Sequence, residues 1–243
     1  MMRQTWSALA AVVAIAALAA AAALVTAAPP EKPAAPETVA PVKEKIVLFN
    51  GKDLAGWAPV IPDPKADPKQ VWSVKDGVIH CAGNPVGYLR TEKAYGGYRL
   101  TFDWCWAGQP ANSGCLVHMH GPDEVWPRSV EVQLGHRDAG DFWVIGNTDF
   151  KEHVNKGDRH VGKKAETNEK PAGQWNTMIV VCQDDAIAVW VNGLLQNRAT
   201  AVRDAQGKPL TQGRICFQSE GGPIEFRNIV LEPVGKQAGT AGK

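Results

Sequence analysis

The chain has 243 residues, with 26 Lys and Arg against 25 Asp and Glu, and a formal net charge of +1 at pH 7. This balance gives no electrostatic basis for binding nucleic acid, and no cluster of basic residues stands out. We expect one domain over residues 46–234, long enough to bury a sizeable core.

The N-terminal segment has the order of a secretory signal peptide. Arg3 precedes an uncharged, alanine-rich run from Ala8 to Val25, and small residues follow it. The run approaches the roughly 20 residues that span a bilayer, so an uncleaved anchor is the alternative. Its alanine content favours a signal peptide over residues 1–27 that is cleaved. The sequence therefore predicts an exported protein, periplasmic or extracellular, with no stable membrane span after cleavage.

Two further segments offer almost nothing to bury. Residues 28–45 are dominated by Pro, Ala, Glu and Lys and are typical of a disordered tether, and residues 235–243 resemble a flexible tail. Five cysteines stand singly in apolar, strand-like runs, which favours buried thiols, although an exported chain permits one or two disulfides. They are Cys81, Cys105, Cys115, Cys182 and Cys216.

From residue 46 onward, short strand patterns alternate with turns, and helical periodicity is missing from this part of the sequence. Asp76-Gly77 and Asn192-Gly193 are strong hairpin turn signals. Such a pattern predicts an all-β, antiparallel sandwich or barrel. The expected strands in chain order are 46–49, 71–74, 78–81, 98–106, 112–120, 129–134, 142–145, 175–182, 186–191, 214–218 and 224–231.

Two of these strands carry polar side chains with a period of two. In residues 112–120, His118 and His120 fall on the same side as Leu116, and in residues 129–134, Glu131 and Gln133 alternate with aliphatic residues. If the strands are neighbours, these groups gather on one face. A polar cluster of this kind is costly to maintain unless it binds or reacts with something.

The polar segment 148–170 is expected to be a long loop that borders a site. Three histidines in polar loops are interpreted as solvated: His136, His153 and His160.

A series of motifs covers nearly all of residues 46–231. In chain order they are Leu48-Phe49-Asn50-Gly51-Lys52-Asp53-Leu54-Ala55-Gly56-Trp57, Trp72-Ser73-Val74-Lys75-Asp76-Gly77-Val78-Ile79, Gly96-Gly97-Tyr98-Arg99-Leu100, Asn112-Ser113-Gly114, Glu131-Val132-Gln133, Trp175-Asn176-Thr177, Val191-Asn192-Gly193 and Phe226-Arg227-Asn228-Ile229. Together these motifs resemble the 3-keto-disaccharide hydrolase family, formerly called DUF1080. Many members carry an Arg where this chain has His118, and residues 135–143 also depart from the family's shorter acidic turn.

The resemblance implies a concanavalin A-like jelly-roll sandwich that is exported and acts on an oxidised saccharide, a 3-keto-glycoside. A ketone at C3 acidifies the C2 proton, so a base can remove it, the C1 substituent can leave, and water can add to the enone. This route needs a base, a stabiliser for the enolate and a proton donor for the leaving group. Glu131, His118 and His120 are the catalytic candidates. His118 and His120 are also the candidates to hold a divalent metal, the one cofactor considered.

Ordinary glycosidases use two carboxylates, whereas here the residue two after Glu131 is Gln133. Asp103, Asp141 or Glu220 from another segment is the alternative second acid. For substrate binding, the candidates are Asn112 and Gln133 as hydrogen-bonding groups and Trp104 and Trp143 as stacking platforms.

Two other functional classes fit the same sequence. One is a non-catalytic carbohydrate-binding module on the same scaffold, and the other is an extracellular scaffold domain, since fold alone does not fix function. The sequence predicts no oligomeric state.

Overall fold

The computed structural model describes residue 39 and residues 41–234. The predicted signal peptide, most of the tether and the C-terminal tail lie outside the described residues. Within the described part, the one helix is α1 (Pro68–Val71), which Asp67 caps by accepting a hydrogen bond from the Lys69 amide. No helix among these residues has the length and apolar character needed to cross a bilayer.

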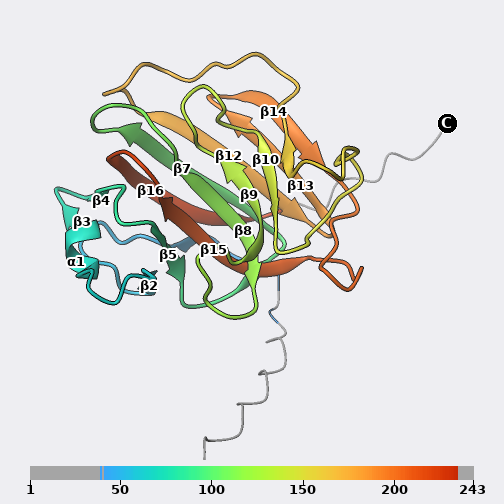
Figure 1. Ribbon diagram of the computed structural model, residues 1–243, viewed down its shortest axis with the longest axis horizontal. Coiled ribbons are helices and arrows are strands. Elements are labelled where there is room, and N and C mark those ends of the chain that lie inside the picture. The colour runs from blue at the N-terminus through green and yellow to red at the C-terminus, as the bar shows by residue number, and fades with distance from the viewer. Residues whose placement is uncertain (1–38, 40, 235–243) are drawn as a thin grey trace, which may run out of the picture. The chain divides into compact units, whose positions relative to one another are not determined.

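The strands form two antiparallel sheets, which confirms the predicted all-β sandwich (Figure 1). In the first, here called sheet I, the order is β14 (Leu194–Ala199), β13 (Ala186–Val191), β12 (Asn176–Gln183), β7 (Tyr98–Trp106), β16 (Ile224–Pro233), β4 (Val78–Cys81) and β3 (Trp72–Lys75), with β1 (Ile46–Val47) beside β16.

Sheet II has the order β11 (His160–Val161), β10 (Phe142–Ile145), β9 (Arg128–Gln133), β8 (Gly114–His120), β15 (Gln212–Ser219), β5 (Gly87–Thr91) and β2 (Trp57–Val60), with β6 (Tyr95–Gly96) beside β15. Strands β8 to β11 are consecutive both in the chain and in the sheet. They therefore present one continuous stretch of sequence as one surface.

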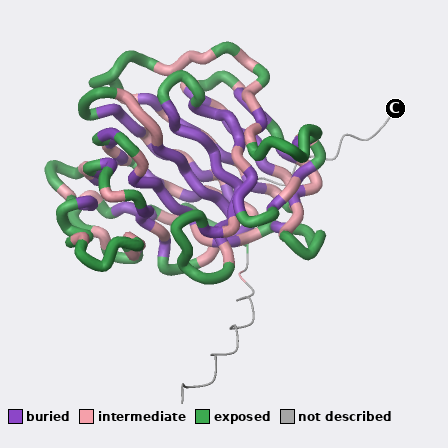
Figure 2. Tube along the Cα trace, in the orientation of Figure 1, coloured by how far each residue is buried: buried purple, intermediate pink, exposed green. Residues whose placement is uncertain are grey.

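The core lies between the sheets, and the buried strand segments form the interior of the tube view (Figure 2). Phe217 of β15 contacts Phe102 of β7 at 4.9 Å and Phe226 of β16 at 4.4 Å between ring centroids. Strand β7 buries alternate side chains from Tyr98 to Trp106, as its period of two predicts. These aromatic contacts fix one face of each sheet inward and leave the other face outward.

The packed part of the chain starts before residue 46. Val42 is buried, and its amide donates to the Gly96 carbonyl at 3.0 Å. All five cysteines are buried free thiols. Several strands were not anticipated because their sequences are short or contain polar residues: β2, β5, β6, β11 and β14.

Strand β8 does not keep the regular alternation that the sequence suggests. Its pairing with β9 shifts between Val117 and His120, and His118 has a φ of 56°, in the left-handed region. As a result Met119 joins Leu116 in one apolar cluster, whereas the His118 ring lies 6.2 Å from the ring of Tyr98 in sheet I. The expectation that His118 and His120 share a side with Leu116 is therefore wrong, because a bulge reverses the facing of His118.

Candidate functional site

Three side chains form a row across the outer face of sheet II. Trp143 of β10 is the direct neighbour of Glu131 in β9 and of His160 in β11. Residues directly opposite each other in antiparallel strands point to the same face, so Trp143 stands between a carboxyl group and an imidazole. Its ring centroid is 4.9 Å from that of His160. This β9–β10–β11 row is the centre of the candidate site.

Glu131 is a buried carboxyl group with a perturbed acidity. Only 6% of the residue is exposed, and burial raises its pKa to about 8, with a further increase from the charge of Glu220. Gln218 and Arg159 partly offset this rise. The group is therefore mainly protonated near neutral pH, which is the state of a proton donor.

Gly114 makes room for Glu131. A Cβ at position 114 would lie 2.3 Å from Glu131 Oε1 and 2.2 Å from Gln218 Oε1, so no other residue fits without moving the site. Gln218 is buried, and neither of its amide atoms has a hydrogen-bond partner of standard geometry among the described residues. Its side chain nevertheless lies close enough to Glu131 to lower the pKa of that carboxyl group.

A second carboxyl group, Glu220, follows strand β15. Burial raises its pKa, and a hydrogen bond with the Asn112 side chain opposes that rise. The side-chain oxygen of Asn112 is also 3.0 Å from where a Cβ on Gly135 would stand. Asn112 and Glu220 thus lie near Glu131 at one end of the row. From sequence, Asn112 and Glu131 were site candidates and Glu220 was an alternative second acid.

Gln133 shares the outer face with Glu131. Its side-chain oxygen accepts hydrogen bonds from the amides of Leu134 at 2.8 Å and Gly135 at 2.7 Å. Its backbone also pairs with Asp141, because the Gln133 amide donates to the Asp141 carbonyl at 2.9 Å. The side chain therefore fixes the turn that follows β9 and lies next to the row.

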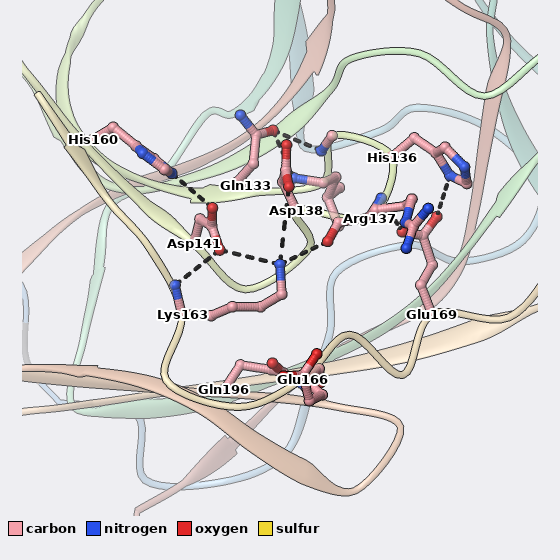
Figure 3. A network of polar contacts seen from close by, with 12 residues as sticks. Gln133, His136, Arg137, Asp138, Asp141, His160, Lys163, Glu166, Glu169 and Gln196 are labelled. Carbon is pink, nitrogen blue, oxygen red and sulfur yellow. Dashed lines mark hydrogen bonds and ion pairs between the residues drawn. The ribbon is translucent and has the colours of Figure 1, made fainter.

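Asp141 orients His160 (Figure 3). Its Oδ2 atom is 2.6 Å from His160 Nε2, and its Oδ1 atom accepts from the Lys163 amide at 2.9 Å and from Lys163 Nζ at 3.3 Å. Asp141 is 4% exposed. A buried carboxylate with these three donors is fully paired and holds both the imidazole and the start of the following loop.

Arg159 supplies a cation beside the row. Its guanidinium carbon lies 5.9 Å from the Trp143 ring centroid, and its charge lowers the pKa of Glu131. The side chain is exposed, so it can reach a bound molecule. The segment 148–170 therefore borders the site through Arg159, His160 and Lys163.

The remaining predicted residues lie away from the row. His118 has no exposed surface, and both ring nitrogens lack a partner among the described residues; burial lowers its pKa to about 4. His120 is half-buried, and its Nδ1 faces the His118 carbonyl oxygen at 3.0 Å. Trp104 is fully buried in the core, where it packs against Phe102. In this arrangement neither His118 nor Trp104 can touch a molecule on the outer face.

The paired histidines do not converge as metal ligands. The described residues contain no group of three or more His, Cys, Asp or Glu side chains arranged to hold a metal ion. The His118 ring is enclosed in the core, whereas His120 lies at the end of the strand. The residues proposed from sequence as a metal pair therefore do not fit that role.

Of the three loop histidines interpreted as solvated, His136 is exposed, His160 is partly exposed and His153 is buried. His153 is 7% exposed and contacts Asp149 and the Asp158 carbonyl oxygen, and His136 is 3.3 Å from Glu169. His160 belongs to the row. Sequence reasoning missed His160, Gln218 and Arg159 as site residues. The one available signal was the position of His160 and Arg159 in a loop already expected to border a site.

A separate hollow of about 580 Å³ lies on sheet I. Its lining includes Asp103, one of the alternative second acids. Asp103 already accepts hydrogen bonds from Thr177 at 2.7 Å and Asn228 at 2.7 Å, and it pairs with Arg227. The two carboxyl groups whose pKa values are raised by burial are Glu131 in β9 and Glu220 directly after β15, both strands of sheet II, so we place the candidate active site there.

The two antiparallel sheets form a concanavalin A-like sandwich, and the outer face of sheet II carries two carboxyl groups with raised pKa values, an indole and a histidine held by a carboxylate. The chain belongs to the family described as the 3-keto-alpha-glucoside-1,2-lyase-like domain, whose model matches residues 44–232. This match confirms the resemblance found in the sequence motifs. No protein with a curated description matches the chain significantly.

Solved structures share the fold. Two structures of a "putative glycosyl hydrolase" from Parabacteroides distasonis are 22% and 24% identical, each with a TM-score of 0.57. Both cover 79% of this chain, and the matches cover 94% and 100% of those chains. A β-glucanase from Bacillus licheniformis is 14% identical with a TM-score of 0.52, over 78% of this chain and 97% of its own. These structures show the same jelly-roll fold, and the family match supports a glycoside-acting enzyme.

Proposed function

We propose that this protein cleaves the glycosidic bond of 3-keto-glycosides by removing the C2 proton, eliminating the C1 substituent and hydrating the product. The observation that carries the proposal is the buried Glu131, protonated at neutral pH and adjacent to the Trp143 platform. The family's description as 1,2-lyase-like supports the elimination step.

Glu131 is suited to act as the general acid. Departure of the C1 oxygen places negative charge on the leaving group, and a carboxylic acid close by can donate its proton as the bond breaks. The pKa near 8 keeps that proton available at neutral pH, and the charge of Glu220 favours retention of the proton. Glu131 thus takes the role of proton donor rather than nucleophile.

Trp143 and Arg159 are suited to bind and polarise the oxidised sugar. The apolar face of a pyranose ring stacks on an indole, as aromatic platforms commonly do with flat apolar surfaces. Arg159 beside this ring is positioned to bind the C3 oxygen, where negative charge develops in the enolate. Asn112 and Gln133 at the end of the row are suited to contact sugar hydroxyls.

The proposal is tested by incubating the purified protein with 3-keto-trehalose or a 3-keto-glucoside, with and without added divalent metal or chelator. Release of free sugar or a 2-hydroxyglycal product supports it. A protein that consumes none of several keto-glycosides contradicts it. Glu131→Gln is the matched variant, because it keeps the size of the side chain and removes the acidic proton.

A carbohydrate-binding module is the alternative on the same face. It would bind saccharides through Trp143 but consume no substrate, and binding would survive Glu131→Gln.

Export to the periplasm or extracellular space is also part of the proposal, since it rests on the sequence of the N-terminal segment. Detection of the mature N-terminus near residue 28 in exported protein tests it.

A further inference from the structure

We propose that His160, held by Asp141, is the base that removes the C2 proton, so that the two proton transfers are divided between His160 and Glu131 on either side of Trp143. This inference rests on the proposed function and assigns a role that sequence reasoning gave to Glu131, His118 or His120. It follows from the placement of three side chains in one row.

The row sets the spacing of the two groups. Neighbouring strands lie about 4.8 Å apart, so the backbones at positions 131 and 160 stand about 10 Å apart with Trp143 between them. A sugar ring on the Trp143 face therefore has a carboxyl group at one edge and an imidazole at the other. C1 and C2 are adjacent ring atoms with separate proton requirements, which two flanking groups can meet.

The contact with Asp141 fixes which nitrogen of His160 is basic. Asp141 accepts hydrogen bonds from Lys163 on Oδ1, and its Oδ2 lies 2.6 Å from His160 Nε2. A carboxylate at this distance requires a hydrogen on Nε2, so the lone pair of the neutral ring is on Nδ1. Nδ1 has no protein partner among the described residues, and the side chain is half-exposed.

The reaction balances without an added oxidant or reductant. His160 Nδ1 takes the C2 proton, and the electron pair of that C–H bond forms the enolate of the C3 ketone. When the enolate collapses, a C1–C2 double bond forms, the bond from C1 to the leaving oxygen breaks, and that oxygen takes the proton of Glu131. Addition of water at C1 and return of a proton to C2 give the free 3-keto sugar.

The other histidines are less suitable. His118 is enclosed in the core, and His136, although paired with Glu169, lies at the opposite side of the Asp141 network (Figure 3). His136 is thus a matched control: it is a second histidine–carboxylate pair contributed by the same loops, but it is outside the row.

The experiment separates proton removal from cleavage. The probe is 3-keto-1,5-anhydroglucitol, which has a C2 proton next to the ketone and no leaving group at C1. The full-length protein is incubated with the probe in D2O, and deuterium uptake at C2 is followed by proton NMR. Cleavage of a 3-keto-glucoside is measured in parallel, and thermal unfolding checks that each variant is folded.

We expect His160→Gln, which keeps a donor for Asp141, to slow C2 exchange by about 10²–10⁴-fold. Glu131→Gln should retain exchange while losing cleavage, and His136→Gln should retain both. Exchange that persists in folded His160→Gln, or a wild-type protein that cleaves without exchanging the probe, overturns the role of His160 and leaves the proposed function standing. A wild-type protein that does neither contradicts the proposed function itself.

If His160→Gln does not fold, Asp141→Asn supplies the second variant. It leaves the His160 ring in place but replaces the carboxylate acceptor with an amide, so both tautomers become available. The expected result is a smaller loss of exchange than in His160→Gln and a changed pH profile of exchange. An unchanged rate and pH profile would contradict the positioning role of Asp141.

Discussion

Glu131 and Trp143 face each other directly across strands β9 and β10, so a carboxyl group held at a raised pKa borders a half-buried indole. Stacking on an aromatic ring is worth about 1 kcal/mol beyond burial, which corresponds to roughly fivefold in affinity. Trp143→Ala should therefore weaken binding of a keto-glucoside about fivefold or more, measured by calorimetry with Glu131→Gln as the inactive background. The exposed Trp126 is the matched control, and Trp126→Ala should leave binding unchanged.

The activity should fall as pH rises past about 8. Glu131 donates a proton only in its protonated form, and its pKa is raised to about 8 by burial and by the charge of Glu220. The measurement is kcat/KM against pH for a 3-keto-glucoside with an alkyl leaving group. A substrate with an aryl leaving group needs less help from an acid, so its rate should decline less. An equal decline for both would contradict the role of Glu131 as the acid.

Folding stability should also depend on the ionisation of Glu131. The carboxyl group has a reference pKa of 4.5 in the unfolded chain and about 8 in the folded protein, so the folded state binds more protons between these values. The contribution of Glu131 to the free energy of unfolding therefore decreases as pH rises from about 4.5 to 8. Glu131→Gln cannot titrate, so its stability relative to wild type should increase over that range. Urea unfolding of both proteins at pH 5, 6.5 and 8 checks this, and a constant difference would contradict it.

The buried His118 should lower the free energy of unfolding at acidic pH. Its folded pKa, lowered to about 4 by burial, lies below the unfolded reference of 6.5. Between these values the unfolded chain binds the extra proton, so the contribution of His118 to stability falls as pH decreases from 6.5 to 4, by up to about 3 kcal/mol. His118→Asn suits the left-handed backbone, and its stability relative to wild type should increase as pH falls through this range. Urea unfolding of both proteins at pH 7, 5.5 and 4.5 measures this difference, which should stay constant if His118 is not the group concerned.

Gly114 should be essential for the position of Glu131. In Gly114→Ala, the new methyl group would overlap Glu131 Oε1 and Gln218 Oε1, so one of them must move. We expect at least a tenfold loss of kcat, with a smaller effect on KM, because the acid is displaced while the platform stays. Gly157→Ala is the control, since its nearest neighbour would be at 3.4 Å. Full activity of Gly114→Ala would show that the carboxyl group can be displaced without harm.

The sequence predicts much of the architecture because strand periodicity and turn residues are local signals. Strands β4, β7, β10 and β13 have the predicted bounds. Asp76-Gly77 joins β3 to β4 and Asn192-Gly193 joins β13 to β14, and the first residue of each pair has a positive φ. Glu131, Gln133, Asn112 and Trp143 could be proposed from sequence because they are polar or aromatic groups in recognisable strands or motifs.

The remaining features depend on contacts between distant segments. The bulge in β8 turns His118 inward, and nothing in the alternation of residues 112–120 signals it. His160 reaches the site only because the two-residue strand β11 pairs with β10, and Gln218 only because β15 pairs with β8. Trp104 and Trp143 look alike in sequence, but the packing of the two sheets buries one and leaves the other half-exposed.

The consecutive order of β8, β9, β10 and β11 has a consequence for how this scaffold diversifies. Asn112, Glu131, Trp143 and His160 all come from one uninterrupted stretch of about fifty residues, and most of the framework strands lie before or after it. A single recombination event across that stretch would replace nearly the whole reacting surface at once. Relatives can thus acquire a different leaving-group preference as a block, while the ring contacts among Phe102, Phe217 and Phe226 are inherited unchanged.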